Sequence, residues 1–456
     1  MSTRFELSDA SKLPPITHAE LIQYFEKASR PRSQWKVGLE IERLLVSRQT
    51  GQQVKFEGPD GIESLLRRLS DRFDWKPFEE NGRLIALLRD GASITLEPGA
   101  QVELSTAPAQ DVWTLKDVLA RHRAECDAVI DAERLVWLGV GLAPFQDVNE
   151  IVMVPKGRYA IMDAYLPPLG SHTRHMMRAT CSVQSAFDFE SEADAGRKFL
   201  TTLSLSPIVN ALFGSAAIYK GSSTGFSSYR GKVWENMDPA RSGHLGAFFD
   251  WDGFSFEKWV DYLISRPMMF YAIHDVFTPA HGRTFKDFME KGLDGYFPNK
   301  DDWEMHLTSV FPEARLKKYL EVRGADCVPE PMVTALPALW KGLFYDPDTL
   351  NAAEHIAREI SGAERLALFQ VTYQQGLAGV WKNRKIQDRA AELVSLAQEG
   401  LRRQAEASGS RDERPLLDPL LKRLEAGQSL GTTLLQDWSK LATDIPAAVE
   451  AMRFNR

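Results

Sequence analysis

The stretch Val37-Gly38-Leu39-Glu40-Ile41-Glu42 alternates apolar and acidic residues. In a β-strand, successive side chains point to opposite faces of the sheet. The three aliphatic residues therefore share one face, and Glu40 and Glu42 share the other face beside the small Gly38. The pattern predicts a strand whose apolar face packs on the core and whose other face carries two carboxylates.

A second segment, TLEPGAQVELS at 95–105, repeats this alternation around a Pro98-Gly99 turn. Its apolar residues are expected to face the core. Glu97 lies just before the turn, and Gln101 and Glu103 lie on the open face. If the two segments pair in one sheet, up to four carboxylates converge.

Four converging carboxylates repel one another, and each raises the pKa of its neighbours. Hard divalent cations with oxygen ligands, Mg²⁺ or Mn²⁺, relieve this repulsion, and magnesium commonly takes its remaining ligands from nucleotide phosphates. The alternative is that both segments are amphipathic strands with a solvated polar face. The depletion of Glu in ordinary strands weakens that alternative.

Basic side chains provide a complementary set. Lys156 and Arg158 lie in a Pro- and Gly-containing stretch, Arg230 follows a Gly/Ser-rich segment, and Arg323 lies in Glu321-Val322-Arg323. Arginine suits bidentate recognition of carboxylates and phosphates. Each residue taken alone is more often part of a surface ion pair, so the hypothesis depends on their occurring together with the carboxylates.

Composition excludes several classes of protein. The chain has 456 residues, with 55 Lys and Arg against 62 Asp and Glu, so that 55 − 62 = −7, and 44% of its residues are hydrophobic. This balance argues against a nucleic acid or an anionic membrane as the main partner. No apolar run reaches the ~18 residues of a membrane span, and the start MSTRFELSDA has no apolar signal region. Three widely spaced cysteines are typical of free thiols, so we expect a cytoplasmic protein.

The order of predicted elements indicates an α+β fold. Residues 83–106 have the pattern of three strands joined by two turns, and a Pro/Gly-rich stretch at 154–171 is expected to be an ordered loop. A helix capped by Ser191 should run toward Leu205, where Pro207 is expected to interrupt or kink it. We expect one catalytic domain over 1–456, strand-rich at 35–190, mixed at 191–350 and helical at 351–456.

Several sequence blocks resemble the plant-type branch of the glutamate–cysteine ligase family, which occurs in plants and many proteobacteria. The resemblance extends from about residue 20 to about residue 445. The blocks, in order, are VGLEIE (37–42), SITLEPGAQVELS (93–105), MVPKGRYAIMDAYLP (153–167), ATCSVQSAFDFESEAD (179–194), GFSSYRGKVWENMDPARSG (225–243), DWEMHLTSVFPEARLKKYLEVRGAD (302–326) and LPALWKGLFYD (336–346).

The resemblance implies a glutamine-synthetase-like fold, in which helices surround a curved, mainly antiparallel sheet with metals on its concave face. It also implies a reaction. ATP phosphorylates the side-chain carboxylate of glutamate, and the amino group of cysteine attacks the acyl phosphate to give γ-glutamylcysteine, ADP and phosphate. This is the first step of glutathione biosynthesis. The implied partners are small molecules only, with Mg²⁺ or Mn²⁺ as cofactor, and the protein itself is expected to be a monomer or a homodimer.

The resemblance also implies roles for individual residues. Arg323 would neutralise charge on the transferring phosphoryl group, and Arg230 would hold glutamate beside Trp234 as a pocket wall. Gln101 would lie on the substrate side of the site. The implied metal ligands are Glu40, Glu42, Glu97, Glu103 and Glu321, and the residues implied to contact nucleotide or phosphate are Lys156, Arg158, Gln184 and Arg323.

One departure from the family pattern affects the predicted site. Gln184-Ser185-Ala186-Phe187-Asp188 stands where the family typically has Gln-Val-Asn-Leu-Asp, so Ala186 replaces an Asn on the strand face that also carries Gln184. Two alternatives therefore stay open. One is a ligase of the same chemistry that uses another amine as acceptor. The other is a catalytically inactive paralogue, which would have no need to keep like charges buried together.

Overall fold

The computed structural model describes residues 14–243, 245–246, 248–251, 253–273 and 276–455. The N-terminal stretch MSTRFELSDA, for which the sequence predicts no signal region, lies outside these residues. None of the helices in the described ranges is long and apolar enough to cross a membrane. Cys126, Cys181 and Cys327 are buried free thiols, as expected.

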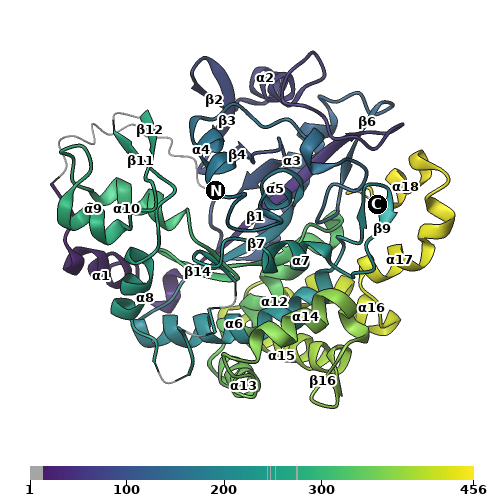
Figure 1. Ribbon diagram of the computed structural model, residues 1–456. Helices are drawn as coiled ribbons and strands as arrows, with labels where there is room; N and C mark the ends of the chain where they lie inside the picture. The colour runs from purple at the N-terminus through teal and green to yellow at the C-terminus, as the bar shows by residue number, and fades with distance from the viewer. Residues whose placement is uncertain (1–13, 244, 247, 252, 274–275, 456) are drawn as a thin grey trace.

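A mainly antiparallel sheet forms the centre of the molecule (Figure 1). Within the described residues it has nine strands in the order β14-β15-β7-β1-β5-β4-β3-β2, with β6 also paired to β1. The α+β expectation is therefore confirmed at the level of a mixed fold built on such a sheet. The strands are β1 (Val37–Ser47), β2 (Lys76–Glu80), β3 (Arg83–Arg89), β4 (Ala92–Leu96), β5 (Val102–Ser105), β6 (Leu135–Leu138), β7 (Ser182–Phe187), β14 (Ala314–Leu316) and β15 (Leu320–Asp326).

The predicted pairing of the two acidic segments is confirmed. β1 runs antiparallel to β5, with Glu42 opposite Glu103, and antiparallel to β7, with Glu40 opposite Gln184. The aliphatic residues of β1 are buried, at 0–1% exposure for the three that alternate with the carboxylates. Burial of that apolar face fixes the register, since a slip of one residue would turn it toward solvent.

The expected three-strand meander at 83–106 is present as β3, β4 and β5. Asp90 and Gly91 have φ angles of 51° and 78°, the left-handed conformation of both central residues in a type I′ hairpin turn. The meander delivers β5 to the edge of β1 and places the Glu97–Gln101 turn at one end of the sheet.

One local prediction is wrong, and a second is wrong in so far as it expected an interruption. The stretch 154–171 contains helix α4 (Gly157–Tyr165), because its prolines lie outside the helical run. Helix α6 (Glu192–Phe213), capped by Ser191 as predicted, continues through Pro207. Nearly all of α6 is buried, and it packs against β15 and helix α14 (Arg365–Gln375), so tertiary packing outweighs the hydrogen bond lost at the proline.

Helices cover the apolar face and flanks of the sheet (Figure 1), with α6 against β15 and α12 (Ala335–Phe344) against β7. The predicted helical character of the C-terminal part is confirmed. The remaining helices are α1 (His18–Glu26), α2 (Ile62–Phe73), α3 (Val112–Asp127), α5 (Thr173–Ala179), α7 (Tyr229–Glu235), α8 (Phe256–Ile264), α9 (Phe285–Lys291), α10 (Lys300–Leu307), α11 (Glu330–Val333), α12 (Ala335–Phe344), α13 (Pro347–Ala357), α14 (Arg365–Gln375), α15 (Ile386–Ser408), α16 (Asp418–Ala426), α17 (Leu430–Leu441) and α18 (Ile445–Ala451).

Short 3₁₀ helices and two-stranded ladders complete the described structure. The 3₁₀ helices are η2 (Arg32–Gln34), η3 (Val148–Glu150), η4 (Gly376–Ala378) and η5 (Arg414–Leu417). The ladders pair β8 (Ile218–Tyr219) with β9 (Ser222–Ser223), β10 (Ser242–Gly243) with β13 (Phe311–Pro312), β11 (Phe270–Ile273) with β12 (Val276–Pro279), and β16 (Val380–Trp381) with β17 (Arg384–Lys385).

Buried His306 on α10 is expected to make folding sensitive to acid. Burial lowers the pKa of its imidazole to about 4 from an ordinary value near 6.5, and Nε2 lies 2.8 Å from the Leu263 carbonyl oxygen. Between these two pH values the unfolded chain binds a proton that the folded protein does not, so stability falls as pH drops through this range. We expect His306→Gln to reduce the dependence of the thermal midpoint on pH between about 6.5 and 4.

The exposed His281→Asn change serves as the control for this experiment and should leave the profile unchanged. A His306→Gln profile parallel to that of the wild type would contradict the interpretation.

Candidate active site

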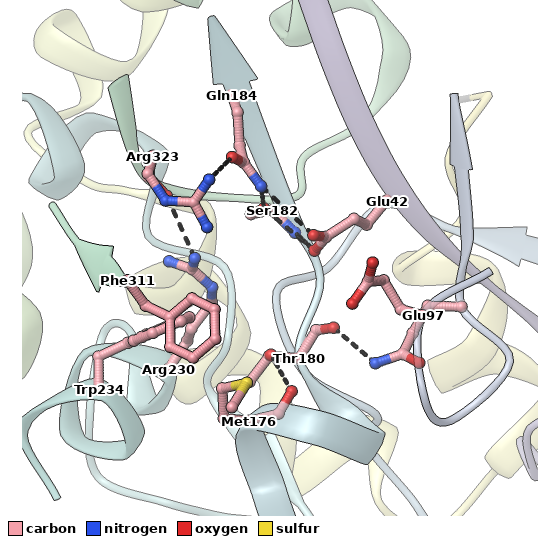
Figure 2. Close-up of a pocket in the computed structure, with 11 residues that line it drawn as sticks. Glu42, Glu97, Met176, Thr180, Ser182, Gln184, Arg230, Trp234, Phe311 and Arg323 are labelled. Atoms are coloured by element: carbon pink, nitrogen blue, oxygen red, sulfur yellow. Dashed lines mark hydrogen bonds between the residues drawn. The ribbon is translucent and has the colours of Figure 1, made fainter. Parts of the chain in front are cut away.

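A cavity opens at the polar face of the sheet, where β1, β7, the β4–β5 turn and helix α7 meet (Figure 2). About 430 Å³ is not filled by protein atoms there, a volume that includes space open to solvent. Carboxylates lie on one side of the cavity and guanidinium groups on the other. The lining residues are Glu42, Glu97, Gln101, Met176, Thr180, Ser182, Gln184, Arg230, Trp234, Phe311 and Arg323.

The acidic side is centred on Glu42. Its Oε2 accepts hydrogen bonds from the backbone N–H of Ser182 (2.7 Å) and from the Ser182 hydroxyl (3.0 Å). Burial, followed by the charges of Glu97 and Glu103, raises the pKa of Glu42 to about 8. This carboxyl group is therefore held beside like charges, in the arrangement that the sequence predicted.

The neighbouring carboxylates extend the acidic side along β1 and β5. Burial, followed by the charges of Glu103 and Glu321, raises the pKa of Glu40. Oε1 of Glu103 accepts hydrogen bonds from the hydroxyls of Thr95 (3.2 Å) and Ser105 (2.9 Å). Glu103 is only 2% exposed, so it supports the cavity wall from behind.

The basic side is formed by Arg230 and Arg323. Nη1 of Arg323 donates a 2.6 Å hydrogen bond to Oε1 of Gln184, which fixes the guanidinium against β7. Arg230 is buried and donates to the carbonyl oxygens of Gly324 (2.8 Å) and Arg323 (3.2 Å). Its guanidinium lies 5.4 Å from the ring of Trp234, which is part of the wall as predicted.

Glu321 lies in a different electrostatic setting. Its Oε2 is 2.5 Å from Nε of Arg315 and 3.4 Å from Nη1 of Arg323, and its Oε1 is 2.5 Å from Nζ of Lys317. Although burial acts to raise the pKa of Glu321, these three cations hold it well below its usual range. Both oxygens are thus engaged by basic side chains, and the role of Glu321 as a metal ligand stays a prediction.

Two predicted site residues, Lys156 and Gln101, bind backbone groups, whereas Arg158 is not among the residues that line the cavity. Lys156 is buried, and its Nζ donates to the Leu96 carbonyl oxygen at 2.8 Å. Burial, with a smaller contribution from the charge of Arg158, lowers the pKa of Lys156 to about 7. The guanidinium of Arg158 lies 5.3 Å from the Tyr159 ring. The Gln101 side chain lines the cavity while its amide group binds the backbone on both sides.

The structure also brings in residues that the sequence interpretation missed. Met176, Thr180 and Phe311 supply the less polar part of the cavity lining. Arg315 and Lys317 surround Glu321, and the pairing of β14 with β15 places Arg315 directly opposite it. The alternation Arg315-Leu316-Lys317, two basic residues separated by an apolar one, was the signal for a second charged strand face.

The donor set is suited to a hard divalent cation, because carboxylate oxygens lie on the acidic side and because burial, followed by neighbouring carboxylates, raises the pKa of Glu40 and Glu42. In the part of the chain that the structure describes, however, no three or more His, Cys, Asp or Glu side chains are gathered closely enough to hold a metal ion. The chemistry of the wall therefore fits a cation such as Mg²⁺, whereas a complete ligand set is not preformed.

Opposed acidic and basic walls across a small cavity define an enzyme-type site for charged small molecules. The comparisons with known proteins specify the class further. The model of "Glutamate-cysteine ligase family 2 (GCS2)" matches residues 36–448. The chain therefore belongs to the glutamate–cysteine ligase family.

Curated relatives agree with this family. The chain is 37% identical over 392 residues to chloroplastic glutamate–cysteine ligase A of Oryza sativa subsp. indica, covering 85% of this chain and 79% of the relative. It is also 37% identical to the chloroplastic glutamate–cysteine ligase of Arabidopsis thaliana, covering 74% of that protein.

A solved structure has the same overall fold. The glutamate–cysteine ligase of Francisella tularensis in complex with AMP superposes with a TM-score of 0.52 at 14% identity, over 91% of this chain and 88% of that one.

The setting of Glu321 predicts a large loss of stability when its charge is removed. Glu321→Gln leaves Arg315 and Lys317 buried without their counter-ion, and breaking a buried ion pair from one side costs about 3–5 kcal/mol. We expect a marked fall in the thermal midpoint, measured by circular dichroism.

Glu304→Gln is the matched control, because Glu304 pairs with Lys318 at 2.6 Å but both side chains are about 40% exposed. Such a surface pair contributes at most about 1 kcal/mol. Equal midpoints for the two variants would mean that the cluster around Glu321 is not held by charge.

Proposed function

We propose that this protein is an ATP-dependent ligase that joins the γ-carboxylate of L-glutamate to the amino group of L-cysteine, the first step of glutathione biosynthesis. The observation that carries the proposal is the cavity with Glu42 and Glu97 facing Arg230 and Arg323 in a chain of this family. Phosphoryl transfer from ATP to glutamate depends mainly on positioning and on neutralisation of charge. A site with two charged walls is built for that task.

Arg323 is the residue that we assign to the transferring phosphoryl group. Its guanidinium is held by Gln184 and Glu321, so its position is fixed before substrates bind. A preorganised cation needs no rearrangement as negative charge develops on the phosphoryl oxygens and on the leaving ADP. Gln184 takes part by fixing Arg323 and reaches toward Glu42 at 3.4 Å, which links the two walls.

Arg230 is assigned to the carboxylate of glutamate. It lies between Arg323 and Trp234, and its Nε is buried without a hydrogen-bond partner among the described residues. A buried N–H donor without a partner costs free energy, which a bound carboxylate would recover. The Trp234 and Phe311 side chains would then contact the aliphatic part of the substrate.

Glu40, Glu42, Glu97 and Glu103 are the residues that we propose hold a divalent cation, Mg²⁺ or Mn²⁺, on the open face of the sheet. When bound, such an ion would neutralise phosphate charge and help to orient ATP. The carboxylates themselves contribute their fixed positions: hydrogen bonds from Ser182 orient Glu42, and hydroxyls of β4 and β5 orient Glu103.

Ala186 is the observation that favours a second candidate, a glutamate ligase with a different amine acceptor. It lies opposite Gly38 on β1 and opposite Glu321 on β15, beside the residues that hold Arg323. An Asn at this position would add a polar group to the strand face that carries Gln184, and the alanine side chain has no such group. The acceptor, the oligomeric state and the cytoplasmic location stay predictions.

Product analysis tests the proposed function directly. The protein is incubated with ATP, Mg²⁺ and glutamate, with cysteine or a panel of other amines, and both phosphate release and product mass are measured. We expect cysteine-dependent phosphate release and the mass of γ-glutamylcysteine. Phosphate release only with another amine would mean that this amine, and not cysteine, is the acceptor. No release with any amine would support an inactive paralogue.

Removal of the Glu42 charge should abolish ligation while the fold survives. Glu42→Gln retains a carbonyl oxygen to accept the Ser182 hydrogen bonds and relieves repulsion with its acidic neighbours. We expect kcat to fall by about 100-fold or more, the scale for losing one preorganised electrostatic contact, with an unchanged or higher thermal midpoint. Glu133→Gln, at an exposed position, is the control. Full activity in Glu42→Gln would mean that the Glu42 carboxylate has no role in the reaction.

A further inference from the structure

The turn Glu97–Gln101 carries two of the residues that line the cavity. Its own backbone closes it, because the N–H of Glu97 donates to the carbonyl of Gln101 at 3.0 Å and the N–H of Ala100 donates to the carbonyl of Glu97 at 2.9 Å. Ala100 has a φ of 67°, a left-handed conformation that costs free energy for a residue with a Cβ. Surrounding contacts must therefore hold the turn in this shape.

Two buried side chains hold the turn on the side of α4. Nζ of Lys156 and the hydroxyl of Tyr159 both donate to the carbonyl oxygen of Leu96, at 2.8 Å and 2.7 Å. Leu96 is the last residue of β4, immediately before Glu97. The N–H of Val154 adds a third contact by donating to the carbonyl of Pro98 at 2.8 Å.

The Gln101 side chain holds the turn on the side of α5. Its Oε1 accepts from the N–H of Gly99 at 2.8 Å, and its Nε2 donates to the carbonyls of Met177 (3.3 Å) and Thr180 (3.0 Å). The backbone of Gly99 lies so close to α5 that a Cβ there would come within 2.1 Å of the Arg178 carbonyl oxygen. The turn is thus fixed between α4 and α5.

These contacts leave Lys156 and Gln101 little capacity to bind substrates. Lys156 is 3% exposed and is not among the residues that line the cavity, while all polar atoms of the Gln101 amide are used by backbone groups. A buried ammonium group loses hydration that a single carbonyl restores only in part. The charges of Glu97 and Glu103 offset part of that loss.

We propose that Lys156 and Gln101 are positioning residues that fix the Glu97 carboxylate at the cavity wall, acting through the Leu96 carbonyl and the Gly99 amide. This assignment replaces the nucleotide-contact and substrate-contact roles that the family resemblance implied for them. It rests on the proposed function in one respect, because Glu97 is taken to bind the divalent cation.

Lys156→Met tests the proposal, because it keeps the length and apolar stem of the side chain and removes the donor. Mn²⁺ binding to the substrate-free protein is followed by electron paramagnetic resonance of free Mn²⁺, and steady-state kinetics give kcat and the KM for ATP. We expect Mn²⁺ affinity and kcat to fall by about 10- to 100-fold, the range for losing an outer-shell partner of a ligand. The KM for ATP, measured at saturating Mg²⁺, should stay within about twofold, since no nucleotide contact is lost.

Lys341→Met is the matched control. Lys341 is also a buried lysine, and its Nζ donates to Glu413 (2.6 Å) and to the Gln110 carbonyl (3.2 Å), none of which lines the cavity. It should lower the thermal midpoint without changing Mn²⁺ affinity. If Lys156→Met does not fold, Tyr159→Phe removes the second donor to the Leu96 carbonyl and should show the same pattern to a smaller degree.

A raised KM for ATP with unchanged Mn²⁺ affinity would overturn the proposal and restore Lys156 as a nucleotide contact. Equal Mn²⁺ affinity in the wild type and in every variant, or no Mn²⁺ binding by the wild type, would also overturn it. Failure of the proposed function is seen separately, as the absence of γ-glutamyl product in the wild type, because the Mn²⁺ titration requires no ligase activity.

Discussion

The antiparallel pairing of β1 with β5 and β7 is the constraint on which the site depends. This register puts Glu42 opposite Glu103 and Glu40 opposite Gln184. Directly opposed like charges destabilise a sheet. The arrangement persists because the other face of β1 is fully buried against the helices, and that burial leaves no freedom to shift the strand. Stability of the core thus holds the acidic wall in a conformation that its own charges oppose.

The two walls show how strongly the surroundings decide the behaviour of one side-chain type. The pKa of Glu42 is raised by burial and by acidic neighbours, whereas the pKa of Glu321 is held low by three cations although burial acts to raise it. A cation bound beside Glu42 would relieve the repulsion there, whereas Glu321 is already neutralised by basic side chains. Under the proposed function, the basic side of the cavity would neutralise an anionic substrate and the acidic side would hold a metal-bound phosphate.

Much of the site was predictable because its signals are local. Strand alternation indicated the shared face of Glu40 and Glu42, and turn residues indicated the meander that brings Glu103 beside them. Predictions failed where distant packing decides the outcome. Pro207 is tolerated inside α6 because neighbouring helices and β15 hold that helix, and no nearby residue signals this.

The sequence by itself determined the strand periodicity, the family and the set of charged residues, since each depends only on the order of side chains along the chain. Tertiary structure decided which of these residues face the cavity. Lys156 and Gln101 have the chemistry of ligand contacts, yet both bind the backbone around Glu97. The reason is physical: a donor takes the acceptor that folding places within about 3 Å, and only the packing of α4 and α5 around the turn selects that acceptor.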